Sequence, residues 1–177
     1  MGMRFWGIDP GQAGAIVAVG MDGKTVEDVR WWRGAHVPPR GLSHGILPHH
    51  VVVIERPYVG KDPHAALELS EWIGMARTQL PLSVDLQRPF AVQWRAKVLR
   101  RSRMGRKQAK SLAIKACRLH SGLKEREASR HDVAEAWAMA RYGWGVWKLA
   151  EELRAAGDEA EVLDEVHYSP TLRGVTA

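Results

Sequence analysis

Gly7-Ile8-Asp9-Pro10-Gly11 closes a short apolar run that begins at Met3. Such a run suits a buried strand, and Pro10 must end it because proline has no N–H to give to a sheet. Asp9 is therefore expected at the carboxyl end of a strand. Its carboxylate either caps the following turn through nearby backbone groups, as Asp often does before Pro-Gly, or binds a cation. The other acidic residues of the chain bear on this choice.

A second apolar run ends in the same way. Val51-Val52-Val53-Ile54 is continuously β-branched, which suits a strand buried on both faces. Glu55 follows it, and Arg56-Pro57 then stops the pairing. Two core strands thus each place a carboxylate at their carboxyl end, which is the edge where ligands bind in open α/β sheets.

A third acidic segment is helical. Ser129 is a fair N-cap for a helix that runs from Arg130 to about Tyr142. Asp132 and Glu135 are three residues apart in it, so they share one face, which could be an ordinary solvated acidic face. With the two strand-end acids, however, they make a set that could hold two divalent cations about 4 Å apart. Oxygen ligands of this kind favour Mg²⁺ or Mn²⁺.

The remaining patterns predict an α/β fold with a mixed sheet flanked by helices. Three antiparallel strands come first, with a two-residue hairpin turn at Asp22-Gly23. The five strands are expected at residues 3–8, 13–19, 24–32, 51–54 and 83–86. The helices are expected at 63–80, 90–99, 106–120 and 130–142, and after a break at Gly143-Trp144-Gly145 up to about Ala156. Residues 1–156 should form one domain, and 157–177 an extension that is partly flexible or contacts a partner.

The composition narrows the class of protein. The 177 residues suffice for about one domain with a real core. Cys117 is the single cysteine, so an intramolecular disulfide or a cysteine-based zinc site is excluded. There is no run of 18 apolar residues and no signal-peptide pattern, which predicts a soluble protein of the cytoplasm without a membrane partner.

Positive charge is concentrated in one part of the chain. The net charge is +6, and the segment from Arg88 to Arg118 contains no Asp or Glu. A face of this kind attracts phosphates through counterion release, although it could also be a solvated surface without a function. The eleven basic residues of the segment are Arg88, Arg95, Lys97, Arg100, Arg101, Arg103, Arg106, Lys107, Lys110, Lys115 and Arg118.

In order and separation, the three acidic motifs resemble those of RuvC-type Holliday junction resolvases, members of the RNase H-like nuclease superfamily. The motifs are Gly7–Gly11, Ile54–Tyr58 and Asp132–Ala138, and the resemblance spans roughly residues 3 to 145. It implies an RNase H-like fold and a crossover junction endodeoxyribonuclease. It also implies a homodimer that nicks a four-way DNA junction symmetrically and leaves 5′-phosphates, with no nucleotide cofactor. The implied catalytic, metal-binding acids are Asp9, Glu55, Asp132 and Glu135, with two Mg²⁺ or Mn²⁺ ions per site.

The resemblance also implies roles for residues around these acids. Tyr58 falls where the family often stacks an aromatic ring on a base, although a core or rim tyrosine would fit the sequence equally well. His131 adjoins the helical acids, where it is either an auxiliary residue that aids proton transfer or a neighbour without a catalytic role. The helix after Pro63 resembles the family's dimer helix, although a plain core helix would show the same apolar stripe. Compact members with a tail like this one are often phage proteins, so the cytoplasm of a bacterium or of a phage-infected host is expected. The resemblance implies DNA contacts by Tyr58, Lys97 and Lys107. The basic segment adds the other expected DNA contacts, which are Arg100, Arg101, Arg103, Arg106 and Lys110.

Three other functions remain open at this stage. One is a broader RNase H-like nuclease for flaps, branches or RNA–DNA hybrids. Another is a non-catalytic, junction-binding protein whose acids have structural roles. Actin-like ATPases also open with an Asp before a glycine turn, but this chain is too short for their two lobes.

Overall fold

The computed structural model describes residues 2–57, 62–101 and 104–156 and contains a five-stranded mixed sheet. The order of the strands is β3-β2-β1-β4-β5. β1, β2 and β3 pair antiparallel, whereas β4 pairs parallel with both β1 and β5. The predicted meander followed by parallel strands is therefore confirmed. The strands are β1 (Phe5–Asp9), β2 (Gly14–Val19), β3 (Val26–Trp32), β4 (Val51–Ile54) and β5 (Asp85–Gln87).

Five helices accompany the sheet in the described residues. Four match predicted helices, and the short α4 was not predicted. α1 begins with Pro63 in its first turn, and the Asp62 side chain accepts a hydrogen bond from the Ala65 N–H. The helices are α1 (Pro63–Gln79), α2 (Ala91–Leu99), α3 (Arg106–His120), α4 (Glu125–Ala128) and α5 (His131–Ala156).

The chain divides into two compact units, residues 1–144 and 145–177. The first contains the sheet, α1 to α4 and the first part of α5. The described part of the second is the rest of α5, and the predicted extension at 157–177 lies outside the described residues. None of the described helices is long and apolar enough to cross a membrane.

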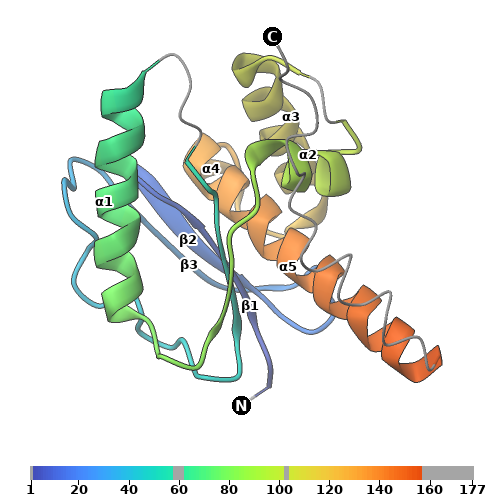
Figure 1. The fold of residues 1–177 in the computed structure, drawn as a ribbon. Helices are drawn as coiled ribbons and strands as arrows, with labels where there is room; N and C mark the ends of the chain where they lie inside the picture. Colours follow the sequence, from blue (N-terminus) through green and yellow to red (C-terminus); the bar gives the residue numbers. More distant parts are fainter. Residues whose placement is uncertain (1, 58–61, 102–103, 157–177) are drawn as a thin grey trace, which may run out of the picture. The chain divides into compact units, whose positions relative to one another are not determined.

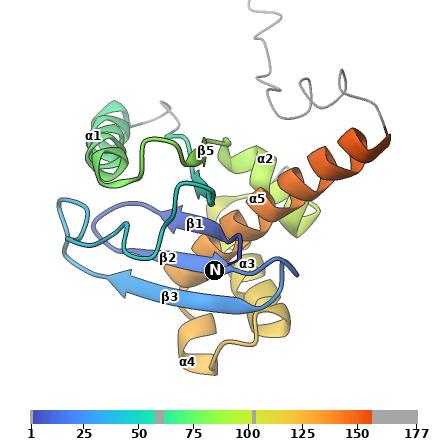
Figure 2. The same cartoon turned by 90° about the horizontal axis from the view of Figure 1, so that it is seen from below.

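The sheet of the first unit is covered on both faces. On one face, Trp6 and Ile54 pack with Trp72, Ile73 and Ala76 of α1. The first part of α5 covers the other face, so the sheet lies between α1 and α5 (Figure 1). Figure 2 shows α1 and α4 on opposite sides of the strands. The alternation of side chains along each strand supplies both apolar layers.

Two glycines let α5 approach the sheet. A Cβ at Gly7 of β1 would lie 1.9 Å from the carbonyl oxygen of Ala136, and one at Gly143 would lie 2.8 Å from Val53 Cγ2. The expected helix break at residues 143–145 is therefore wrong, because Gly143 serves close packing inside a continuous α5. This close approach brings the acidic turn of α5 next to the end of β1.

Two local predictions also need correction. Ser129 is the C-cap of α4, and its hydroxyl donates to the carbonyl of Glu125, the first residue of that helix. Ser129 therefore does not begin α5 as predicted. The connection between β2 and β3 is six residues long, from Gly20 to Thr25, and not a two-residue turn. Asp22 holds it by accepting hydrogen bonds from the Thr25 hydroxyl and from two backbone N–H groups, which lower the pKa of Asp22.

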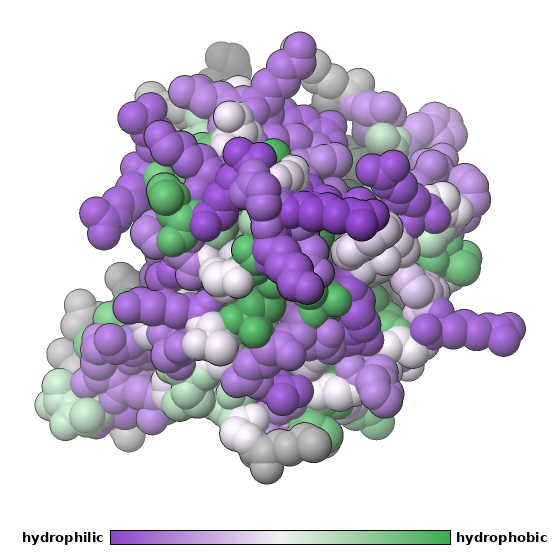
Figure 3. Space-filling view, turned by 180° about the vertical axis from the view of Figure 1, so that it is seen from behind, coloured by the Kyte–Doolittle hydropathy of each residue, from purple (hydrophilic) through white to green (hydrophobic). Residues whose placement is uncertain are grey.

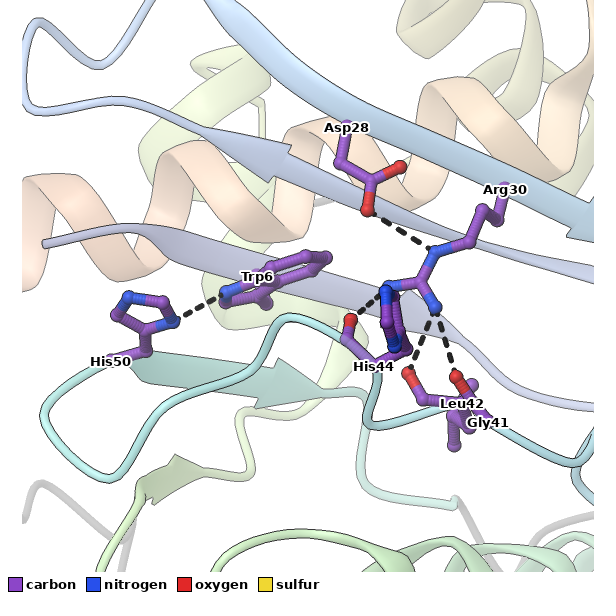
Figure 4. Close-up of polar contacts among 7 residues, drawn as sticks. All are labelled: Trp6, Asp28, Arg30, Gly41, Leu42, His44 and His50. Atoms are coloured by element: carbon purple, nitrogen blue, oxygen red, sulfur yellow. Dashed lines mark hydrogen bonds and ion pairs between the residues drawn. The ribbon is translucent and has the colours of Figure 1, made fainter. Parts of the chain in front are cut away.

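Arg30 of β3 ties the connection before β4 to the sheet (Figure 4). Its guanidinium donates to the carbonyl oxygens of Gly41 and His44, each at 3.0 Å, and to that of Leu42 at 3.4 Å. It also lies 5.4 Å from the ring centroid of Trp6. Backbone carbonyls of an irregular segment are thereby satisfied by one side chain.

We expect Arg30→Gln to lower the free energy of unfolding by roughly 2 kcal/mol, because several charge-assisted hydrogen bonds are lost together. Urea denaturation measures this change. Arg33→Gln is the matched control, since Arg33 is exposed and makes no contact of this kind with the described residues. Equal stability of the two variants would contradict the role given to Arg30.

Candidate functional site

Asp9 is the last residue of β1, where it pairs with Ala15 of β2. Pro10 follows, and Gly11 has a φ of 128°, a backbone conformation that favours glycine. The Trp32 indole donates to the Gly11 carbonyl at 2.9 Å and fixes the turn. No hydrogen bond to the Asp9 carboxylate comes from the described residues, so the structure gives Asp9 no turn-capping role.

Glu55 and Glu135 reach the same pocket as Asp9. Glu55 directly follows β4, and Trp94 of α2 donates from its indole to Glu55 Oε2 at 2.7 Å. Glu135 lies in the second turn of α5 and is 7% exposed. The pocket has a volume of about 770 Å³. Its wall also includes Ala65, Ala66 and Leu69 of α1, Ala91, Val92 and Arg95 of α2, and Arg106 of α3.

The carboxylates in this pocket repel one another. Burial raises the pKa of Asp9 well above its usual value, and the charges of Glu135 and Glu55 raise it further. Burial also raises the pKa of Glu135, although Lys110 opposes this shift. Enclosed acids with raised pKa values mark a place where a cation would lower the electrostatic free energy.

Glu135 already has basic neighbours in the structure. Its carboxylate lies 3.7 Å from an Arg95 guanidinium nitrogen and 3.9 Å from the Lys110 ammonium. These distances indicate ion pairs rather than close hydrogen bonds. Arg95 and Lys110 therefore neutralise the charge of Glu135 only in part, and the pocket remains acidic.

Asp132 pairs with an arginine and is not among the residues that line the pocket. It is 3% exposed, and its Oδ2 accepts a hydrogen bond from Arg130 at 3.0 Å. The Arg130 guanidinium in turn lies 3.8 Å from the ring centroid of Trp31 on β3. Asp132 does not line the pocket, and its charge raises the pKa of Asp9 less than those of Glu135 and Glu55 do. Of the four predicted acids, Asp9, Glu55 and Glu135 line the pocket together, and Asp132 does not.

His131, predicted as an auxiliary residue, lies beside Asp132. Its Nδ1 is 3.5 Å from Asp132 Oδ1, and half of its side chain is exposed. Burial lowers the pKa of His131, as does the nearby charge of Lys110, while Asp132 opposes them. A neutral imidazole at the edge of the site is the expected form near neutral pH.

Within residues 2–57, 62–101 and 104–156, no group of three or more His, Cys, Asp or Glu side chains is close enough to hold a metal ion as it stands. The donor chemistry nevertheless suits a hard cation, because Asp9, Glu55 and Glu135 offer only carboxylate oxygens. A divalent ion would compete with the loose ion pairs of Glu135. The residues fit Mg²⁺ or Mn²⁺ in type, and they would need small side-chain movements to enclose it.

The predicted DNA contacts fall into two groups in the structure. Arg106 lines the pocket and Lys110 pairs with Glu135, so both belong to the site itself. The others that are described lie on the surface around the connection from α2 to α3: Lys97, Arg100, Arg101 and Lys107. Tyr58 and Arg103 lie outside the described residues.

The sequence prediction missed the residues that hold the acids in place. Trp94, Arg95 and Arg130 contact Glu55, Glu135 and Asp132 respectively. Two of these contacts join residues about forty positions apart, and no local spacing signals them. Arg130 is two residues from Asp132, and that proximity was the one available signal.

We expect Trp94→Phe to reduce the rate of any reaction that depends on Glu55 about tenfold, because the variant loses the indole donor to Glu55 Oε2. The measurement is a single-turnover rate alongside thermal melting. Trp72→Phe is the matched control, since the Trp72 indole is also buried but donates to no described residue. An equal loss in both variants would show that the effect comes from packing.

The sequence matches no protein-family model and no curated protein. Two solved structures of RuvC from Thermus thermophilus do resemble this chain. One, in complex with a Holliday junction substrate, has 17% identity and a TM-score of 0.54, and the match covers 78% of this chain and 91% of that one. The other has 16% identity and the same TM-score, with 89% and 98% covered. The chain therefore has a RuvC-like fold, as the resemblance in its motifs implied.

Proposed function

We propose that this chain, which has a RuvC-like fold, is a metal-dependent endonuclease that resolves four-way DNA junctions by paired symmetric nicks and leaves 5′-phosphates. One observation carries the proposal: Asp9, Glu55 and Glu135, from three separate elements, line one pocket together with Arg95 and Arg106. Carboxylates that can bind cations thus lie in the same pocket as guanidinium groups that can bind phosphates. That combination suits the hydrolysis of a phosphodiester.

Asp9, Glu55 and Glu135 would hold the Mg²⁺ or Mn²⁺ ions, with Asp132 completing the set once it leaves Arg130. Bound ions would supply an activated water and neutralise charge on the leaving oxygen. Trp94 orients the Glu55 carboxylate, and Lys110 balances the charge of Glu135. Arg106, which lines the pocket, would contact a DNA phosphate.

The partners follow from the same proposal. The exposed basic residues around the α2–α3 connection would bind the backbone of a junction arm. On α1, Leu67 is 57% and Met75 is 38% exposed, whereas Ala76 is buried in the core. The exposed part of α1 is therefore where a second subunit would dock in a homodimer. Elsewhere, the face seen in Figure 3 is mainly hydrophilic, with hydrophobic residues in small separate groups.

Cleavage of a panel of labelled substrates tests the proposed specificity. We expect a four-way junction to be cut in Mg²⁺ much faster than a linear duplex, a flap or an RNA–DNA hybrid. Comparable cleavage of flaps or hybrids would instead indicate a broader RNase H-like nuclease. Size-exclusion chromatography with light scattering checks the homodimer.

A second candidate is a junction-binding protein without catalysis. It is favoured by one observation, that Glu135 and Asp132 already pair with Arg95, Lys110 and Arg130. Calorimetric titration with Mg²⁺ and Mn²⁺ separates the two candidates. Binding of neither ion would favour the non-catalytic protein, whereas binding that Asp9→Asn abolishes would favour the nuclease.

A further inference from the structure

Arg130 links β3 to the first turn of α5. It directly precedes α5, and its backbone is fixed on both sides. Its N–H donates to the Glu127 carbonyl at 3.0 Å, and its own carbonyl accepts from the Ala134 N–H at 2.9 Å. The Arg130 guanidinium lies 3.8 Å from the ring centroid of Trp31 on β3, and it donates to Asp132 Oδ2 at 3.0 Å. One aromatic ring and one carboxylate therefore hold the guanidinium.

The pair of Arg130 and Asp132 is shielded from water. The Asp132 side chain is 4% exposed and the Arg130 side chain 16%. Water competes little for such a charge-assisted hydrogen bond, and removing one partner of a buried pair leaves an uncompensated charge. Trp31 adds a cation–π contact to the guanidinium. Arg130 thus holds Asp132 more firmly than Glu135 is held by its two basic neighbours, which lie 3.7 and 3.9 Å away.

The carboxylate that Arg130 holds is also a candidate ligand for a cation. Asp132 precedes Glu135 by three residues on α5, and Glu135 lines the pocket with Asp9 and Glu55. Asp132 itself is not among the residues that line the pocket. A carboxylate that neutralises a guanidinium offers less charge to a divalent ion, so the two cations compete for Asp132.

We propose that Arg130 is a positioning residue that competes with the divalent ion for Asp132 and thereby weakens binding of the ion to the site. This role rests on the proposed function, because it takes Asp132 to be a ligand of the ion. Asp132 joins the three pocket acids only after its hydrogen bond to Arg130 opens, and the Trp31 ring opposes this step by holding the guanidinium. A supporting residue that orients Asp132 for the ion would have the opposite effect, since its loss would weaken binding.

Calorimetric titration with Mg²⁺ and with Mn²⁺, in the absence of DNA, tests the competition. Arg130→Met loses the charge and the donor but keeps an unbranched side chain against Trp31, so it should bind either ion about tenfold more tightly. Trp31→Leu changes no charge and loosens the guanidinium, so it should tighten binding about threefold. Arg4→Met is the matched control and should leave the affinity unchanged, because Arg4 pairs with Glu27 and precedes β1, at the opposite end of the strand from Asp9.

Each result of the titrations has a definite meaning. Weaker or unchanged binding of the ions in Arg130→Met overturns the competition. A tenfold gain in Arg130→Met without any gain in Trp31→Leu also overturns it, because the loss of a positive charge would then explain the effect by itself. Binding of neither ion to the unaltered protein or to any variant would refute the proposed metal-dependent nuclease, and the role of Arg130 with it.

Thermal melting in EDTA tests the pair itself. Arg130→Met should melt at a lower temperature than the unaltered protein, because it leaves the buried Asp132 carboxylate without its partner. The double variant Arg130→Met/Asp132→Asn should recover most of this loss, since the uncompensated charge is then gone. If Arg130→Met does not fold, Arg130→Gln replaces it, because glutamine can keep one hydrogen bond to Asp132 without the charge, and it should tighten binding of the ions in the same direction. An equal loss of melting temperature with and without Asp132→Asn would overturn the pairing, and with it the competition.

Discussion

Asp9→Asn should abolish cleavage and, in the absence of metal, make the folded protein more stable. The carboxylate of Asp9 is enclosed beside Glu135 and Glu55, and its pKa is raised by burial and by both charges. A neutral amide of the same size removes that repulsion. It also removes a cation ligand at the centre of the site, so we expect a loss of rate on the order of 10³-fold or more.

The pH dependence of this gain in stability has a definite sign. The folded-state pKa of Asp9 is raised above its usual value of 3.8, so between these two values the folded state binds more protons than the unfolded state. Stability of the metal-free protein therefore falls as the pH rises through that window, and above it the full penalty is present. The difference in melting temperature between Asp9→Asn and the unaltered protein in EDTA should be largest above the raised folded-state pKa of Asp9 and should shrink as the pH falls toward 3.8.

Asp85→Asn is the matched control for Asp9→Asn, because Asp85 is exposed at the edge strand β5 and contacts Gln87. It should leave both cleavage and the pH dependence unchanged. Mg²⁺ should raise the melting temperature of the unaltered protein but not that of Asp9→Asn. A lower melting temperature for Asp9→Asn in EDTA, or cleavage at the normal rate, would contradict the assignment of Asp9.

Gly7→Ala should have the largest effect on stability. The new Cβ would lie 1.9 Å from the Ala136 carbonyl oxygen and 2.5 Å from the Ala140 nitrogen. Both contacts are backbone atoms, so no side-chain rotation relieves them, and β1 must separate from α5. We expect a loss of at least about 3 kcal/mol in the free energy of unfolding, and with it a loss of cleavage because Asp9 and Glu135 move apart.

Gly74→Ala tests whether the effect is specific to Gly7. Gly74 lies on the exposed side of α1, and a Cβ there meets nothing within 4 Å. Alanine is the better helix former, so this variant should gain about 0.5–1 kcal/mol. Guanidinium denaturation measures both variants. If Gly7→Ala were as stable as the unaltered protein, α5 could not lie as close to β1 as the structure has it.

Helices and strands that form because of their own residue pattern could be predicted from the sequence. The β-branched run of β4 and the 15-residue pattern of α3 specify their structure without help from distant residues. The break predicted at Gly143 was wrong because a glycine in a helical segment can either end the helix or allow close packing. Only the contact of Gly143 with the sheet shows that it allows close packing. Ser129 misled the prediction for a similar reason, since its hydroxyl found an acceptor in α4.

The same distinction, between local sequence pattern and contacts with distant residues, applies to the candidate site. Asp9 and Glu55 could be found because each follows a buried strand that a proline must end, and Glu135 because it shares a helix with a second acid. The pairing of Asp132 with Arg130 could not be predicted, because the Arg130 guanidinium also packs on the ring of Trp31 from a distant strand.

Incubation with a synthetic four-way junction, labelled on each strand in turn and mapped at nucleotide resolution with and without Mg²⁺, tests the central claim most directly. The account predicts paired nicks at symmetric positions in two opposed strands, with 5′-phosphate ends, in Mg²⁺ alone. Intact junctions in both Mg²⁺ and Mn²⁺, with the protein folded and bound to the DNA, would contradict it.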